Sequence, residues 1–89
     1  MNSQKFFNQI NIPPRMKYIG QNNIDRSVGA VLQVAEFVWL RVFHEKENKG
    51  GVVEKKYNHA RSKFEYSCLI SNKSADVVNE FLSNYIPTA

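Results

Sequence analysis

Apolar residues recur at helical spacing through the middle of the chain. Steps of 4, 3, 4, 3 and 4 positions separate the members of this series, which are Ile24, Val28, Val31, Ala35, Val38 and Val42. That spacing places them on one face of a helix and predicts a long helix that begins near residue 24. The alternative is a strand over residues 36–46, because the valine, tryptophan and phenylalanine residues of that stretch favour β structure.

Two interpretations compete after residues 47–51, whose paired glycines predict a break in the chain. Aromatic and branched residues alternate with other residues over positions 63–70, which is typical of a strand with one buried face. Residues 52–57 would then pair with this strand in a hairpin, with residues 58–62 as the loop. The alternative over residues 52–70 is helical, because apolar residues there also fit steps of 4 and 3 positions.

The C-terminal segment carries the features of a short helix. Ser74 is suited to the N-cap, and Asp76 lies in the first turn, where the helix dipole favours a negative charge. Pro87 ends the pattern. The apolar face between them comprises Val77, Val78, Phe81, Leu82 and Tyr85.

Residues 1–15 are predicted to form an N-terminal arm on a single globular domain of residues 16–89. Pro13 and Pro14 disfavour helix around them, and the apolar side chains of the arm are expected to dock on the core or on a partner. The predicted fold class is α+β, with the long helix and the C-terminal helix packed on a small antiparallel β-hairpin or sheet. The alternative is an all-α domain of three helices.

Composition and the distribution of apolar residues indicate the cellular compartment in which the protein is expected. The chain has 89 residues, a formal net charge of +4 and one cysteine, which excludes an internal disulfide. No apolar stretch reaches the roughly 20 residues needed to cross a bilayer, and the N-terminus has no apolar segment typical of a secretory signal. We therefore expect a soluble, cytoplasmic protein with no membrane partner.

The apolar residues of the predicted long helix suggest an interaction surface. They would nearly encircle the helix, and a domain of this size can cover one broad face of it. Aromatic side chains at such surfaces are typical interface anchors. The leading hypothesis is a non-enzymatic interaction module, regulatory or accessory, that docks on a protein partner or forms a homodimer. The predicted interface residues are Phe37, Trp39, Leu40 and Phe43.

A basic segment supports an alternative hypothesis, in which the predicted hairpin binds nucleic acid. Its candidate residues are Lys55, Lys56, Tyr57, Arg61 and Lys63. Cationic side chains neutralise phosphates, and an exposed ring can stack on a base. The chain contains no motif of a known nucleic-acid-binding class, so this alternative depends on charge and aromatic content.

Catalysis is not expected from this sequence. Cys68, His44 and His59 are the residues that could form a nucleophile–base pair. Cys68 shares its predicted strand face with aromatic and branched residues, so we expect a buried, unreactive thiol. The spacing of these residues matches no metal motif, and the chain has no glycine-rich phosphate loop. The sequence therefore predicts no enzyme, no catalytic residue, no metal site and no cofactor.

Overall fold

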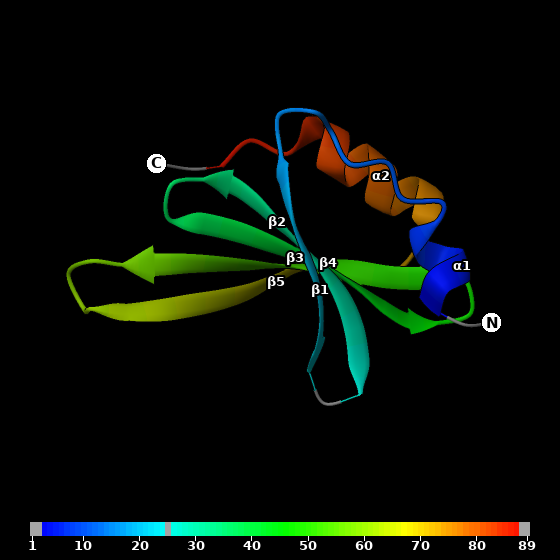
Figure 1. Cartoon of the computed structure of the whole chain (residues 1–89), viewed down its shortest axis with the longest axis horizontal. Coiled ribbons are helices and arrows are strands. Elements are labelled where there is room, and N and C mark those ends of the chain that lie inside the picture. Colours follow the sequence, from blue (N-terminus) through cyan, green and yellow to red (C-terminus); the bar gives the residue numbers. More distant parts are fainter. Residues whose placement is uncertain (1–2, 25, 88–89) are drawn as a thin grey trace.

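A computed structural model describes residues 3–24 and 26–87 as a five-stranded antiparallel sheet with a short helix near each end of the chain (Figure 1). In chain order the elements are α1 (Ser3–Phe7), β1 (Lys17–Ile24), β2 (Ser27–Ala35), β3 (Val38–Lys46), β4 (Lys49–Asn58), β5 (Lys63–Ser74) and α2 (Ala75–Asn84). Each strand pairs with the next one along the chain, so the sheet is a simple meander. The fold class is α+β, but its arrangement differs from the predicted one.

The predicted long helix is wrong, and so is the all-α alternative. Strands β2 and β3 occupy the stretch where helical spacing was found, and they are joined by a turn at Glu36 and Phe37. The strand alternative for residues 36–46 is confirmed by β3. Both faces of β2 and β3 carry apolar side chains, so the alternation of period two is hidden in the sequence and the apolar run imitates a helix.

The hairpin interpretation of the second half is confirmed, and the helical alternative for residues 52–70 is wrong. Strand β4 pairs with β5 from Lys49 to Asn58. The predicted break over residues 47–51 is confirmed at Glu47 and Asn48, which form the turn between β3 and β4, whereas the paired glycines belong to β4. A Cβ atom on Gly51 would lie 2.2 Å from the Ile70 carbonyl oxygen and 2.7 Å from the Phe43 ring. Gly51 is therefore required by close approach within the sheet rather than by a turn.

Helix α2 confirms the C-terminal prediction. The Val77 backbone N–H donates to the Ser74 hydroxyl oxygen at 3.4 Å, and Asp76 lies in the first turn. Val78 and Leu82 are fully buried, as expected from the helical spacing, whereas Val77 is 42% exposed. None of the helices in residues 3–24 and 26–87 has the length and apolar character needed to span a membrane.

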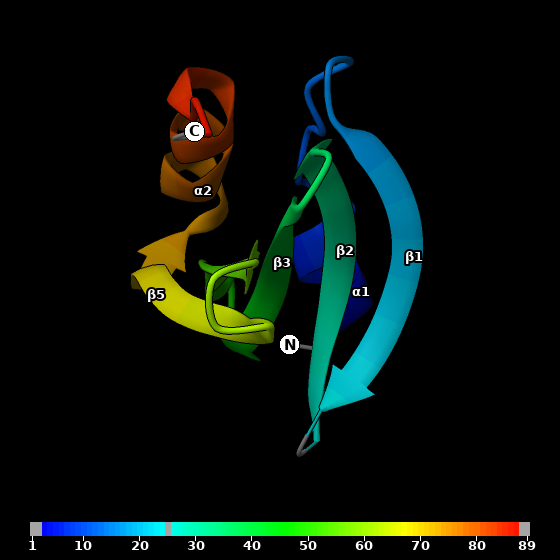
Figure 2. The same cartoon turned by 90° about the vertical axis from the view of Figure 1, so that its left-hand side faces the viewer.

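The hydrophobic core lies on one face of the sheet, which we call the covered face. Helix α1 packs beside β3, and α2 packs beside β4 and β5. Figure 2 shows α2 on the β5 side of the sheet and β1 on the other side. The buried cluster consists of Phe6, Met16, Ala30, Leu32, Leu40, Val42, Val52, Ala75, Val78, Leu82 and Tyr85. Phe6 is fully buried, so the N-terminal arm contributes to the core of its own chain.

Arg15 joins the segment before β1 to the end of α2. One guanidinium nitrogen, Nη2, donates to the backbone carbonyl oxygens of Leu82, Ser83 and Tyr85 at 3.0, 3.1 and 2.9 Å. Carbonyl groups at a helix C-terminus lack partners within the helix and carry partial negative charge. Arg15 therefore stabilises the end of α2 and holds it against the N-terminal segment.

Candidate functional site

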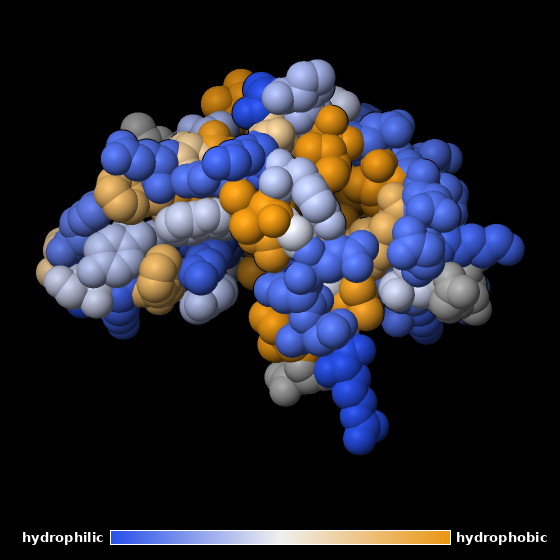
Figure 3. Space-filling model, viewed as in Figure 1, coloured by the Kyte–Doolittle hydropathy of each residue, from blue (hydrophilic) through white to orange (hydrophobic). Residues whose placement is uncertain are grey.

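The face of the sheet opposite the helices carries a mixture of rings, aliphatic side chains and cations. We call it the open face. Strand register places on it Val31, Gln33, Trp39, Arg41, Phe43, Val53, Lys55, Tyr57, Phe64, Tyr66 and Cys68. None of these residues is acidic. Glu54 and Glu65 alternate onto the covered face, and Glu45 lies at the β3 bulge, where it has no register partner. The view of Figure 3, which has β1 in front as in Figure 1, shows hydrophobic side chains near the middle of the molecule with hydrophilic side chains around them.

Five rings meet at one end of the open face. We call them the aromatic cluster: Phe37, Trp39, Tyr57, His59 and Phe64. Ring centroids lie 4.4 Å apart for Phe37 and His59, 5.1 Å for Tyr57 and Phe64, and 6.0 Å for Trp39 and Phe64. The Tyr57 N–H donates to the Phe37 carbonyl oxygen at 3.0 Å, which fixes the turn before β3 against β4. The cluster is partly exposed, with Phe37 at 41% and Phe64 at 44%.

Lys55 extends among these rings. Its Nζ atom lies 4.2 Å from the centroid of the Phe64 ring and 5.6 Å from that of Trp39. A cation is attracted to the negative face of an aromatic ring, so these contacts hold the ammonium group over the sheet. The open face therefore presents a positive charge directly beside stacking surfaces.

Arg41 is the second cation of the open face, and it lies flat across β2. Its Nε donates to the Asn22 side-chain oxygen at 2.8 Å, and its Nη2 donates to the Ser27 carbonyl oxygen at 2.7 Å. Gly29 makes this position possible, because a Cβ there would lie 2.3 Å from Arg41 Nε. Partial burial lowers the pKa of the Arg41 guanidinium from its ordinary value. Its Nη1 also donates to the Ser27 hydroxyl oxygen at 3.4 Å, so all three of these hydrogen bonds go to neutral oxygens.

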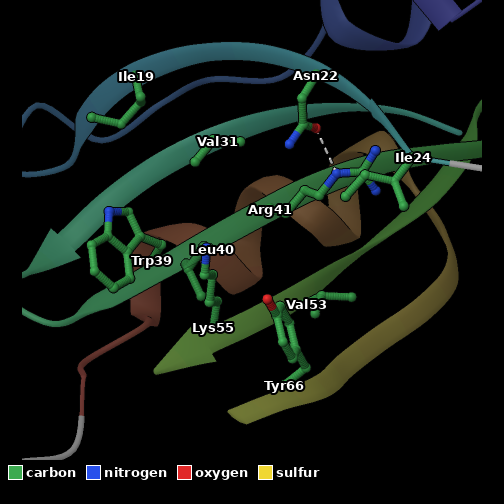
Figure 4. Close-up of a pocket in the computed structure, with 10 residues that line it drawn as sticks. All are labelled: Ile19, Asn22, Ile24, Val31, Trp39, Leu40, Arg41, Val53, Lys55 and Tyr66. Atoms are coloured by element: carbon green, nitrogen blue, oxygen red, sulfur yellow. Dashed lines mark hydrogen bonds between the residues drawn. The ribbon is translucent and has the colours of Figure 1, made fainter. Parts of the chain in front are cut away.

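The middle of the open face is hollowed into a trough of about 390 Å³. Its lining residues are Ile19, Asn22, Ile24, Val31, Trp39, Leu40, Arg41, Val53, Lys55 and Tyr66. Strands β2, β3 and β4 form the floor, while β1 and β5 form the two sides (Figure 4). Tyr66 is 65% exposed and rises from the β5 side. The trough thus joins the aromatic cluster to Arg41.

The residues predicted to form a partner interface are divided by the structure. Trp39 and Phe43 point to the open face, and Phe37 is exposed in the turn between β2 and β3. Leu40 is fully buried in the core on the covered face. An apolar helix face that carries all four does not exist, because β-strand alternation sends Leu40 to the side opposite its neighbour Trp39.

The predicted basic residues are divided in the same way. Lys55 and Tyr57 lie on the open face, whereas Lys56 pairs in register with Glu65 on the covered face. Arg61 and Lys63 are exposed at the tip of the β4–β5 hairpin.

Sequence reasoning missed Arg41 and Tyr66 as members of this surface. Arg41 lies in the stretch that was predicted to form the long helix, and it was not among the candidate residues. Tyr66 was assigned to the buried face of its strand, although the alternation over residues 63–70 correctly grouped it with Phe64 and Cys68. The prediction of a buried Cys68 is wrong, since the thiol lies on the open face and is exposed.

No group of three or more metal-ligating side chains was found in residues 3–24 and 26–87. Comparison of the chain with protein-family models, with curated proteins and with solved structures gave no match. The case for a function therefore depends on the geometry of the open face.

Proposed function

We propose that this protein binds single-stranded nucleic acid through its open face and has no enzymatic activity. The observation that carries the proposal is the position of Lys55, whose ammonium lies over the rings of Trp39 and Phe64. No acidic residue is among those that the strand register places on this face. Nucleic acid offers a chemical partner both for the ammonium group and for the rings. Its phosphates attract cations, and its bases stack on aromatic rings.

The exposure of the rings favours a single strand over a duplex. Phe64 and Tyr66 are 44% and 65% exposed, and both project from the same face of β5. Bases in a duplex are already stacked on one another, whereas the base faces of a single strand are available to side chains. Arg61 and Lys63 at the hairpin tip extend the positive charge beyond the aromatic cluster. Such contacts attract phosphates without reading sequence.

The protein-interaction function expected from the sequence assumed an apolar helix face. In its place are two strands whose outward side combines rings with Arg41 and Lys55. An interface built for apolar contact is depleted of charge at its centre. Arg41 and Lys55 are cationic, and the strand register places no acidic residue beside them. This charge distribution favours a polyanion as the partner of the open face.

Fluorescence anisotropy of labelled oligothymidylate and oligouridylate tests the proposal. We expect binding at low salt, an affinity that falls linearly on a log–log plot against salt, and quenching of Trp39 on stacking. The double variant Lys55→Gln, Lys63→Gln should bind more weakly, with a salt slope lower by about one to two. The control variant Lys46→Gln, Lys73→Gln removes the same charge at exposed positions outside the aromatic cluster.

Three results would contradict the proposal. The first is no binding of either strand at low salt, and the second is an equal loss of affinity in both double variants. The third is a dimer in light scattering whose formation shields Trp39 while no oligonucleotide binds. That third result would support protein interaction at the same face.

A further inference from the structure

The trough differs in character from the aromatic cluster beside it. Its floor is aliphatic, with Val31 and Val53 from the central strands, and Ile19 and Tyr66 stand at its sides. Clusters of exposed rings offer a surface for stacking, but a hollow with walls can enclose a group. A volume of about 390 Å³ falls within the range of sites that take small ligands.

Positive charge lies toward both ends of this apolar hollow. Figure 4 shows Trp39 and Lys55 toward one end, and Arg41 with Asn22 toward the other. Lys55 is held over the Trp39 and Phe64 rings, and Arg41 is fixed by its hydrogen bonds to Asn22 and Ser27. The trough therefore has an apolar middle between two positioned cations.

A nucleotide within a strand has the complementary arrangement. Its base is a flat, largely apolar ring, and the phosphates on its two sides carry negative charge. We propose that the trough encloses one unpaired base of the bound strand, with the flanking phosphates directed toward Lys55 and Arg41. This inference rests on the proposed function and deepens it, because it assigns one nucleotide to a pocket while its neighbours stack on the aromatic cluster. A paired base cannot enter, so the pocket selects against duplexes.

The trough can be filled without changing its charge. Val53 is half-buried at the floor, and the variant Val53→Phe places a ring in the space assigned to the base. Val77→Phe makes the same substitution at a 42% exposed position on α2, away from the open face, and serves as the matched control. The probes are a strand of about twelve abasic deoxyribose phosphates and the same strand carrying one thymine. The abasic strand is uniform, so it can bind in whichever register brings its single thymine to the trough.

We expect the native protein and Val77→Phe to bind the one-thymine strand roughly tenfold more tightly than the abasic strand. Val53→Phe should lose most of this gain and keep only the part that stacking of the thymine on the aromatic cluster contributes. Circular dichroism of each variant confirms that the fold is retained.

Two results would overturn the inference while native binding of oligothymidylate keeps the proposed function intact. One is the absence of any gain from the thymine in the native protein, a measurement that needs no variant. The other is a full gain in a folded Val53→Phe, which would place the base outside the trough. If the native protein binds no oligonucleotide at all, the proposed function fails, and the assignment of the trough fails with it.

Discussion

Replacing Leu40 with alanine tests the division of the sheet into a covered and an open face. The Leu40 side chain is fully buried, and it lies opposite Leu32 on the covered face. Alanine removes the contacts of the side chain and leaves a cavity, which costs about 2–5 kcal/mol in well-packed cores. A domain of this length has a total stability of about 4–13 kcal/mol. We therefore expect Leu40→Ala to lose a large part of the free energy of unfolding.

Phe37→Ala is the matched comparison, because the sequence placed both residues in one interface. Phe37 is 41% exposed, and its ring contacts His59 at 4.4 Å. Loss of an aromatic pair at a partly exposed site costs about 1 kcal/mol. Urea unfolding followed by far-UV circular dichroism measures the free energy of unfolding of both variants. The comparison requires that this free energy depends on urea concentration with the same slope in both. A smaller loss for Leu40→Ala than for Phe37→Ala would refute the assignment of Leu40 to the core.

Further predictions concern three side chains. Arg15→Met should lower the free energy of unfolding by about 1–2 kcal/mol, because the α2 carbonyls lose a charged donor. Arg15→Lys should recover part of this loss in urea unfolding. An unchanged urea midpoint for Arg15→Met would contradict the capping role. Burial, reinforced by a hydrogen bond to Glu54, raises the pKa of Tyr85 above its unfolded value of about 10. The stability linked to the Tyr85 proton is therefore complete below about pH 10 and is lost as pH rises further. The fall of the urea midpoint at alkaline pH should be shallower in Tyr85→Phe than in the native protein. Identical profiles of midpoint against pH for the two proteins would contradict this. Cys68 is exposed, so a thiol reagent should label the native protein about as fast as the unfolded chain, and strong protection would contradict the open-face assignment.

Local features of the sequence were sufficient for the second half of the fold. Ser74, Asp76 and the apolar spacing between them predicted α2, because an N-cap and a helix face are properties of a short segment. The β4–β5 hairpin was predicted from alternation over residues 63–70, since β5 carries polar residues between its aromatic ones. Lys55 and Tyr57 were identified as candidates from the charge and aromatic content of their segment.

The first half could not be predicted in the same way, because the turns after β1 and β2 lack the usual signals. Arg26 adopts a positive φ angle of 68° in the turn after β1, a position that glycine or asparagine occupies more often. The turn at Glu36 and Phe37 contains no glycine or proline either. Without a visible turn, two strands with apolar residues on both faces read as one long helix.

The sequence by itself determined that the chain has an apolar core, a capped C-terminal helix, a hairpin with basic residues and a surplus of large apolar side chains near Trp39. Only the tertiary structure decided where that surplus goes. Pairing of β2, β3 and β4 sends Leu40 to the covered face and Trp39 to the open face, and it separates Lys55 from Lys56 in the same way. The physical reason is that successive residues in a strand point to opposite sides, while the side that faces the core is chosen by helices distant in sequence.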